Sequence, residues 1–164
     1  MTKDHYNVLF ICTGNSARSI IAEGLMNSVS RGRFRAYSAG SHPTGVVNPL
    51  ALEVLADLRI PTDGFRSKNW DEFAGPDTIP LDFVFTVCDK AAGETCPHWA
   101  GQPMTAHWGV PDPAAFEGTA VERKAQFRTT AVTLKRRIDL MLSLPMASLD
   151  EMAIQREIKD IGTR

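Results

Sequence analysis

The sequence predicts an α/β protein, a three-layer sandwich in which helices cover both faces of a four-stranded parallel sheet. Short apolar segments rich in β-branched and aromatic residues alternate with longer segments of helical periodicity, as expected for parallel strands joined by crossover helices. The chain has 164 residues, 43% of them hydrophobic, so it can bury a substantial core, and no linker divides it. We therefore expect a single domain that spans residues 1–164.

The first predicted strand and helix flank a short loop. Residues 7–11 (NVLFI) are apolar and run into a Thr-Gly turn, as a buried parallel strand would. The apolar residues that follow recur at helical spacing: Ile20, Ile21, Leu25 and Met26. The helix is therefore expected to begin within a turn of Arg18.

The second strand is predicted over residues 33–37 (RFRAY), which Gly32 and Gly40 bracket. Asn48 followed by Pro49 is typical of a helix start, because asparagine caps the first turn and proline suits the first helical position. The expected apolar face of this second helix consists of Leu50, Val54, Leu55 and Leu58.

Two more strands are predicted in the middle of the chain. Residues 82–87 (DFVFTV) form the third strand, and Cys88 follows at its carboxyl end. Residues 104–108 form a shorter fourth strand. Because ligands of such folds bind outside the carboxyl ends of the strands, we expect Cys12 and Cys88 at the same edge of the sheet.

Two helices are predicted near the end of the chain. Thr119 with Glu122, and Ser148 with Glu151, have the spacing of capping boxes, and the second pair predicts a helix over residues 149–161. The expected inward faces are Val121, Ala125, Ala131, Leu134, Ile138 and Met141 in the first helix and Met152, Ile158 and Ile161 in the second.

The composition excludes several classes of function. A net charge of −1 argues against nucleic-acid or membrane-surface partners, which usually require a basic field. No segment has the apolar length of a signal peptide or a membrane span, so we expect a cytoplasmic protein. Three cysteines do not suggest a disulfide framework, and no histidine pair at ligand spacing accompanies them, so no metal site of the zinc type is predicted.

Residues 12–18 (CTGNSAR) predict an anion-binding site with a reactive thiol. The N–H groups between Cys12 and Arg18 can converge on an oxyanion at the positive end of the helix. The planar guanidinium group of Arg18 forms a fork of donors that can bind two oxygens at once. We expect a thiol in this field to be partly or largely ionised and nucleophilic. Ser19 can donate a hydrogen bond to the thiolate, and Asn15 can hold the loop open. Taken singly, the cysteine would be a buried strand-end residue and the arginine a surface residue.

The segment CTGNSARS, followed by IIAEG, resembles the phosphate loop of low-molecular-weight tyrosine phosphatases and of the arsenate reductases built on the same fold. The resemblance implies that fold, with Cys12 as the nucleophile. It implies an anion site made of Thr13, Gly14, Asn15, Ser16, Ala17 and Arg18. Asp112, in an Asp-Pro that favours an extended loop, would be the general acid. The alternative is a turn in which Asp112 only bonds its own backbone.

Cys88 and Cys96 flank the segment DKAAGET, which a flexible loop could close into a disulfide. They are similar to the cysteine pair of thioredoxin-coupled arsenate reductases. The resemblance implies that Cys88 attacks Cys12 and that Cys96 then attacks Cys88. Ala17 stands where many thioredoxin-coupled relatives have another cysteine, so thioredoxin and a glutathione-linked, glutaredoxin-type reductant both stay open as electron donors. The alternative is a buried strand-end cysteine and an incidental surface thiol.

Some reductases of this family bind a potassium ion near the phosphate loop. The corresponding positions are Asn15, Glu23 and Ser38, with Asp71 as a candidate fourth ligand. Glu23 can equally be a carboxylate on the face of a helix.

The resemblance favours an arsenate reductase, an enzyme that contributes to resistance against arsenicals. It would bind arsenate, phosphate or sulfate and would use an external thiol reductant without a tightly bound cofactor. The alternative is a phosphatase that hydrolyses aryl phosphate monoesters through a Cys12 phosphoenzyme, although residues 114–116 (Ala-Ala-Phe) lack the paired tyrosines of typical tyrosine phosphatases. A non-catalytic anion-binding module would leave Cys88 and Cys96 unexplained.

Overall fold

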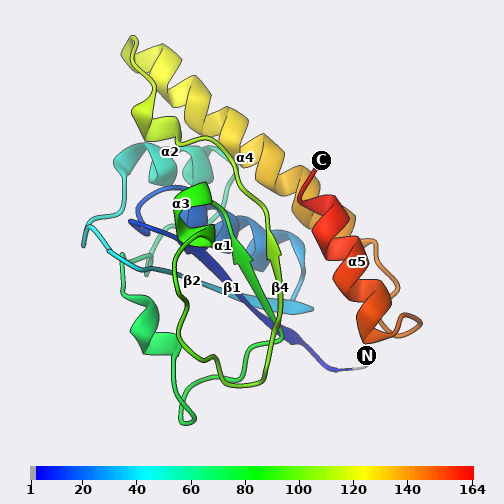
Figure 1. Cartoon of the computed structure of the whole chain (residues 1–164). Helices are drawn as coiled ribbons and strands as arrows, with labels where there is room; N and C mark the ends of the chain where they lie inside the picture. Colours follow the sequence, from blue (N-terminus) through cyan, green and yellow to red (C-terminus); the bar gives the residue numbers. More distant parts are fainter. Residues whose placement is uncertain (1–2) are drawn as a thin grey trace.

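Four parallel strands form the central sheet in the spatial order β2-β1-β3-β4 (Figure 1). In this computed structural model, which describes residues 3–164, the strands are β1 (Tyr6–Cys12), β2 (Phe34–Gly40), β3 (Phe83–Thr86) and β4 (Met104–His107). The predicted α/β class and four-stranded parallel sheet are confirmed. Met1 and Thr2, which the single-domain prediction includes, lie outside the described residues, and that prediction stays a prediction.

Within residues 3–164, five α-helices and two short 3-10 helices pack around the sheet. They are α1 (Arg18–Val29), α2 (Pro49–Asp57), η1 (Trp70–Phe73), α3 (Asp89–Ala92), η2 (Pro113–Ala115), α4 (Ala120–Leu142) and α5 (Glu151–Ile161). Contacts join α1, α2 and α4 to one another, and α5 packs on β4. None of the helices in residues 3–164 is long and apolar enough to cross a membrane. The sequence did not predict α3, η1 or η2.

Alternate strand residues point to opposite sides of the sheet, and other elements pack on both sides. On one side Phe85 stacks on Trp108 with ring centroids 4.0 Å apart. The indole N–H of Trp108 donates to the carbonyl oxygen of Ile158 at 2.9 Å, which fastens α5 to this face. On the other side Tyr37 packs against Phe73 of η1 with centroids 5.6 Å apart.

The predicted caps are confirmed for two helices and wrong for the third. Asn48 accepts the N–H of Leu50 at the start of α2, and Thr119 and Glu122 form the capping box of α4. α5 is capped by Asp150, which directly precedes it, and not by Ser148. The reason is local, because the N–H of Ser148 is part of a turn and donates to the carbonyl oxygen of Pro145.

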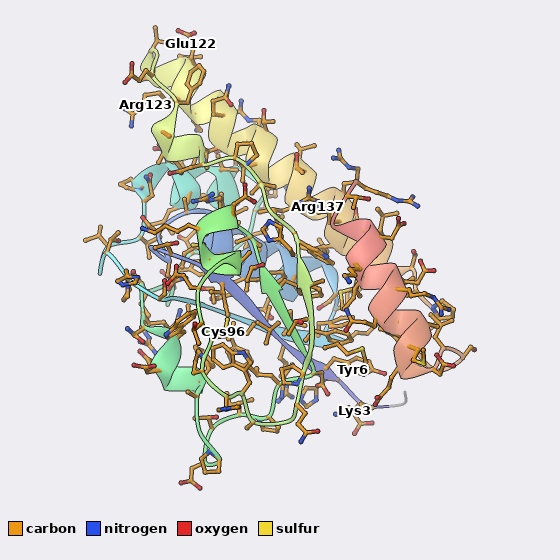
Figure 2. All side chains as sticks on the ribbon, in the orientation of Figure 1. Lys3, Tyr6, Cys96, Glu122, Arg123 and Arg137 are labelled. Carbon is orange, nitrogen blue, oxygen red and sulfur yellow. The ribbon has the colours of Figure 1, made fainter. Side chains whose placement is uncertain are left out.

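Three residues predicted to face the core are exposed, namely Leu58, Val121 and Met152, at 47%, 81% and 74%. Leu58 caps the end of α2 beyond its last helical turn. Val121 lies in the first turn of α4, and Figure 2 shows the neighbouring Glu122 and Arg123 at the outer end of that helix. Met152 lies opposite the face that α5 buries, which consists of Ile154, Ile158 and Ile161.

Strand boundaries also differ from the prediction. β2 continues past Tyr37 to Gly40, because it pairs with β1 up to the register Cys12–Gly40. β3 is shorter than residues 82–87, and β4 ends at His107. The longer β2 brings its last residues alongside the loop that follows β1.

Candidate active site

The loop of residues 13–17 joins the end of β1 to the start of α1, with Cys12 and Arg18 at its two ends. Cys12 is only 3% exposed. The residue that precedes α1, Ala17, makes no side-chain cap, and the first turn of the helix carries no acidic side chain. The N–H groups of that turn are therefore left for an anion, which the helix dipole also favours.

The carbonyl groups of this loop are turned away from its centre, because the following segment binds them. The carbonyl oxygens of Thr13, Gly14 and Ser16 each accept a backbone N–H from residues 42–48, at 2.9, 3.0 and 2.9 Å. The N–H groups of residues 14–17 donate to no atom of the described chain. A run of N–H groups left free in this way forms a concave cradle for an oxyanion.

Two residues fix the path of the loop. Asn15 is fully buried and has a φ of 44°, a left-handed conformation that asparagine adopts more readily than most other side chains. Gly40, at the end of β2, lies against the loop, and a Cβ atom there would stand 2.5 Å from the carbonyl oxygen of Thr13. Only glycine fits at this point without moving the loop.

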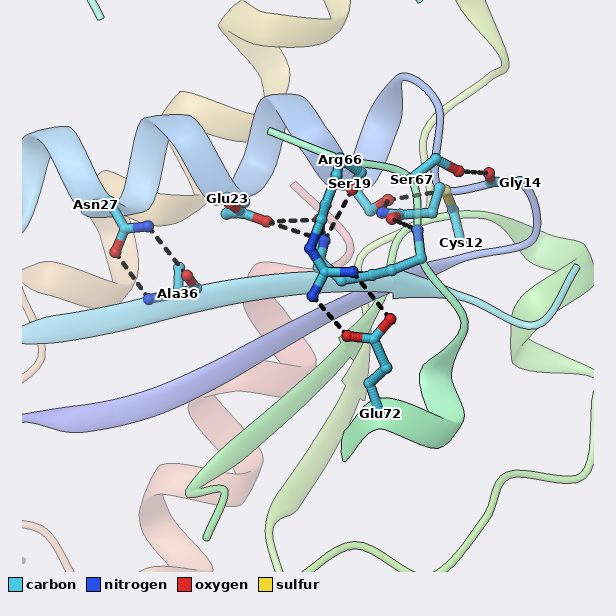
Figure 3. A network of polar contacts seen from close by, with 12 residues as sticks. Cys12, Gly14, Ser19, Glu23, Asn27, Ala36, Arg66, Ser67 and Glu72 are labelled. Carbon is cyan, nitrogen blue, oxygen red and sulfur yellow. Dashed lines mark hydrogen bonds and ion pairs between the residues drawn. The ribbon is translucent and has the colours of Figure 1, made fainter. Parts of the chain in front are cut away.

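A chain of hydrogen bonds leads to the thiol (Figure 3). The backbone N–H of Lys68 donates to Asn15 Oδ1 at 2.9 Å, and Asn15 Nδ2 donates to Ser19 Oγ at 2.8 Å. Ser19 Oγ lies 3.0 Å from Cys12 Sγ. Because the hydroxyl already accepts from Asn15, its own proton is free to donate to the sulfur, which stabilises a thiolate.

Arg18 reaches from α1 toward the loop that carries Asp112. Its Nη1 donates to the carbonyl oxygen of Val110 at 3.1 Å, and its Nη2 lies 4.0 Å from Asp112 Oδ2. The other carboxylate oxygen, Asp112 Oδ1, accepts the N–H of Ala114 at 3.0 Å. Asp112 Oδ1 thus forms the local turn that the sequence offered as the alternative role of this residue, while Oδ2 faces the guanidinium group of Arg18.

Arg137 of α4 binds the backbone of the segment that leads to Asp112, a contact that the sequence did not predict. Its Nη1 donates to the carbonyl oxygens of Trp108 and Gly109, at 2.7 and 3.1 Å, and Nε donates to the carbonyl oxygen of Arg164. Burial lowers the pKa of Arg137 from its ordinary value, and the nearby Arg136 adds to this. The only sequence signal was an arginine inside the apolar face of a helix.

Arg18, Cys88 and Asp112 line one cleft of about 440 Å³ at the carboxyl edge of the sheet. Lys90 of α3 also lines this cleft and was not predicted. The lining of the cleft thus contains two cationic side chains, Arg18 and Lys90, and two carboxylates, Asp89 and Asp112.

Cys88 lies beside the loop because β3 continues alongside β1. The N–H of Val87 donates to the carbonyl oxygen of Ile11 at 2.8 Å, and Cys88 Sγ lies 3.6 Å from Thr13 Oγ1. The sulfur is buried and caps α3 by accepting the N–H of Ala91 at 3.4 Å. The predicted proximity of this thiol to the Cys12 loop is therefore present in the fold.

Cys96 is exposed on the long loop between α3 and β4 (Figure 2), and all three cysteines are free thiols. Glu94 connects this segment to the loop of residues 13–17, which we call the anion loop. Its Oε1 accepts from Ser41 Oγ at 2.9 Å and lies 3.4 Å from Thr13 Oγ1. Partial burial of the sulfur and then the charge of Glu94 raise the pKa of Cys96.

The raised pKa predicts how Glu94→Gln will change thiol reactivity. Because only the thiolate reacts, a raised pKa leaves less reactive Cys96 near neutral pH. Removing the negative charge lowers that pKa, so the pH profile for alkylation of Cys96 should move to lower pH. Peptide-level mass spectrometry after iodoacetamide treatment measures this shift. The exposed Glu117→Gln is the matched control, and superimposable profiles for the two variants would contradict the prediction.

The residues predicted around a potassium ion are already bound to one another and to Lys68. Ser38 Oγ donates to Glu23 Oε1 at 2.6 Å, while Lys68 Nζ lies 3.9 Å from that carboxylate oxygen and 3.5 Å from Ser38 Oγ. The side-chain oxygen of Asn15 accepts from Lys68, and Asp71 is exposed on η1. These residues do not fit a potassium ion, because an ammonium group lies where the ion would bind.

The strand-end thiol, the inward N–H groups and the arginine at the following helix define a class of α/β proteins with a cysteine-centred oxyanion site. The chain belongs to the low molecular weight phosphotyrosine protein phosphatase family, whose model matches residues 7–156.

Within this family, the chain is similar to several arsenate reductases. An arsenate reductase of Halalkalibacterium halodurans is 35% identical over 131 residues, which cover 80% of this chain and 91% of that protein. A solved arsenate reductase in the phosphate binding state has a TM-score of 0.68 at 26% identity, over 84% of this chain and 97% of that one. A thioredoxin-dependent arsenate reductase of Corynebacterium glutamicum has a TM-score of 0.58 at 26% identity, over 85% of this chain and 65% of that one. The resemblance to arsenate reductases of this fold is confirmed.

Proposed function

We propose that the protein is an arsenate reductase that converts arsenate to arsenite with electrons from its own thiols. The observation that carries the proposal is the second buried thiol at the loop, since Cys88 Sγ lies 3.6 Å from the hydroxyl of Thr13, the residue after Cys12. Hydrolysis of a phosphate ester consumes no electrons and needs one thiol. Reduction of arsenate takes two electrons and needs resolving thiols. The activity named for the similar proteins supports the same choice.

In the first step the Cys12 thiolate attacks the arsenic atom, and a hydroxide leaves. The N–H groups of the loop and the Arg18 fork hold the remaining oxygens, where negative charge is greatest. Asp112 donates a proton to the departing hydroxide, which leaves as water. Such proton transfer typically contributes about 10²–10⁴-fold to the rate. The product is a Cys12–arsenic adduct in which arsenic is still pentavalent.

Two thiol exchanges then complete the reduction. The Cys88 thiolate attacks Cys12 Sγ, a disulfide forms, and the electron pair of the sulfur–arsenic bond stays on arsenic, which leaves as trivalent arsenite. The Cys96 thiolate next attacks Cys88, which frees Cys12 as a thiolate and leaves a Cys88–Cys96 disulfide. Because Cys96 lies on an exposed loop, this last disulfide is accessible to a second protein.

An external dithiol regenerates the enzyme by reducing that disulfide. We propose thioredoxin as this partner, on the model of the thioredoxin-dependent neighbour, with a glutathione-linked reductant as the alternative. No tightly bound cofactor is required, because the thiols carry both electrons. The same first step with an aryl phosphate would form a Cys12 phosphoenzyme, so phosphatase activity is expected as a side reaction of this site.

A single exposure to arsenate without reductant tests the proposal. Each molecule should release one arsenite and acquire a Cys88–Cys96 disulfide, which peptide mass spectrometry identifies. The Cys96→Ser variant should stop one step earlier, with a Cys12–Cys88 disulfide. Adding thioredoxin, its reductase and NADPH should give sustained turnover of the unmutated protein only. Arsenite release with Cys88 and Cys96 both still reduced would overturn the internal relay.

A further inference from the structure

The side chain of Lys68 is largely covered beneath the anion loop, although lysine side chains are mostly exposed. Its side chain is 10% exposed, and Nζ donates to the carbonyl oxygen of Arg66 at 2.9 Å. Burial lowers the pKa of Lys68 and raises that of Glu23, and the attraction between the two groups opposes both changes. The fold thus retains a charge pair that desolvation disfavours, which calls for a functional reason.

This one residue connects the loop to the elements on both sides of it. The backbone N–H of Lys68 donates to Asn15 Oδ1, and its carbonyl oxygen accepts the N–H of Gly40 at 2.9 Å. Its ammonium group lies against Glu23 of α1 and Ser38 of β2. Figure 3 shows this network from Glu23 to Ser67 and Gly14, with Cys12 and Ser19 among its residues.

The contacts connect the backbone of Lys68 to the thiol, while its ammonium group fixes the position of that backbone through Glu23, Ser38 and the carbonyl oxygen of Arg66. Asn15 is held in its left-handed conformation because its side-chain oxygen Oδ1 accepts the backbone N–H of Lys68 and its Nδ2 donates to Ser19 Oγ. Ser19 Oγ in turn lies 3.0 Å from Cys12 Sγ. A change in the position of Lys68 would therefore alter both the loop N–H groups and the serine that faces the sulfur.

We infer that Lys68 is a positioning residue that supplies a built-in monovalent cation behind the anion loop, in the place that a potassium ion would take between Glu23 and Ser38. The inference rests on the proposed anion-binding role of the loop but not on arsenate reduction. Ammonium and potassium carry the same charge, and either can bring a carboxylate and a hydroxyl oxygen together. The lysine cation is tethered, so the loop keeps its binding conformation whether or not potassium is present.

A pair of variants separates loss of the cation from loss of the side chain. Lys68→Ala removes the ammonium group and leaves room for an ion, whereas Lys68→Met removes the charge but fills the space with a similar stem. The readout is the affinity for inorganic phosphate, measured by calorimetry at equal ionic strength in choline, potassium or ammonium chloride. Choline is too large to enter the site.

The unmutated protein should bind phosphate equally well in all three salts. Lys68→Ala should bind phosphate about 5–150-fold more weakly in choline chloride, the usual range of coupling between two sites, and potassium or ammonium should restore most of the affinity. By reciprocity, phosphate should tighten potassium binding to this variant by the same factor. Lys68→Met should show the loss without the rescue.

Thermal unfolding in each salt keeps a folding defect distinct from a loop defect. The double variant Glu23→Gln with Lys68→Met contains no unpaired buried charge, so it should fold and bind phosphate weakly in every salt. Wild-type phosphate affinity in the double variant or in Lys68→Ala would overturn the inference. Potassium-specific tightening in the unmutated protein, or a loss in Lys68→Ala that no small cation repairs, would overturn it as well. None of these outcomes depends on whether arsenate is reduced.

Discussion

Cys12→Ser is expected to abolish both arsenate reduction and aryl phosphate hydrolysis while phosphate binding survives. A serine hydroxyl is a far weaker nucleophile than a thiolate, and both reactions begin with attack by this atom. We expect each rate to fall by roughly 10⁴-fold or more. Phosphate affinity should not fall, because the loop N–H groups and Arg18 are unchanged and a negative charge next to the anion has been removed.

Steady-state assays with arsenate and an aryl phosphate, together with phosphate titration, measure these effects. The near-isosteric side chain can still interact with Ser19, so the melting temperature should stay close to that of the unmutated protein. Cys96→Ser is the matched control for aryl phosphate hydrolysis, since it also removes one thiol but lies on an exposed loop. Substantial turnover by the Cys12 variant would exclude this residue as the nucleophile.

Cys88→Ser should separate the two activities. Sustained arsenate reduction should be lost, since no thiol remains to attack Cys12 and release arsenite, whereas aryl phosphate hydrolysis should persist. The cap of α3 survives the change, because Cys88 Sγ accepts the N–H of Ala91 and serine is a favourable residue at that position. The fall in arsenate turnover should therefore reflect chemistry and not a displaced helix.

The Cys88→Ala variant provides the structural comparison. It lacks both the thiol and the cap, so it should be less stable than the serine variant by about 1 kcal/mol, while its arsenate turnover should be equally low. Equal loss of both activities in Cys88→Ser would point to a damaged loop. Full thioredoxin-driven arsenate turnover in that variant would show that an external thiol resolves Cys12 directly.

The sequence alone determined the α/β class and the anion loop, because both depend on local patterns. Strand 7–11, the Thr-Gly turn and the helix from Arg18 lie within one short stretch, so their order in the chain already implies a thiol and an arginine at the two ends of a cradle. The caps at Asn48 and Thr119 are equally local and are confirmed. The resemblance carried by the loop then predicted the acid and the cysteine pair.

Apolar periodicity did not decide which side chains are buried at the ends of helices. Leu58, Val121 and Met152 are as apolar as their neighbours, but they lie where no other element covers them. Burial needs a partner surface as well as an apolar side chain, and the partner comes from the packing of whole helices.

The groups that support the loop follow from tertiary packing and not from any local pattern. Lys68, Glu94 and Arg137 lie far along the chain from the segments they hold, and no spacing rule connects them to those segments. Their roles depend on loops and helices being packed side by side. The contact of the Lys68 side chain with the oxygens of Glu23 and Ser38 is of the same kind, because it comes from a distant loop and a local sequence motif contains no information about it.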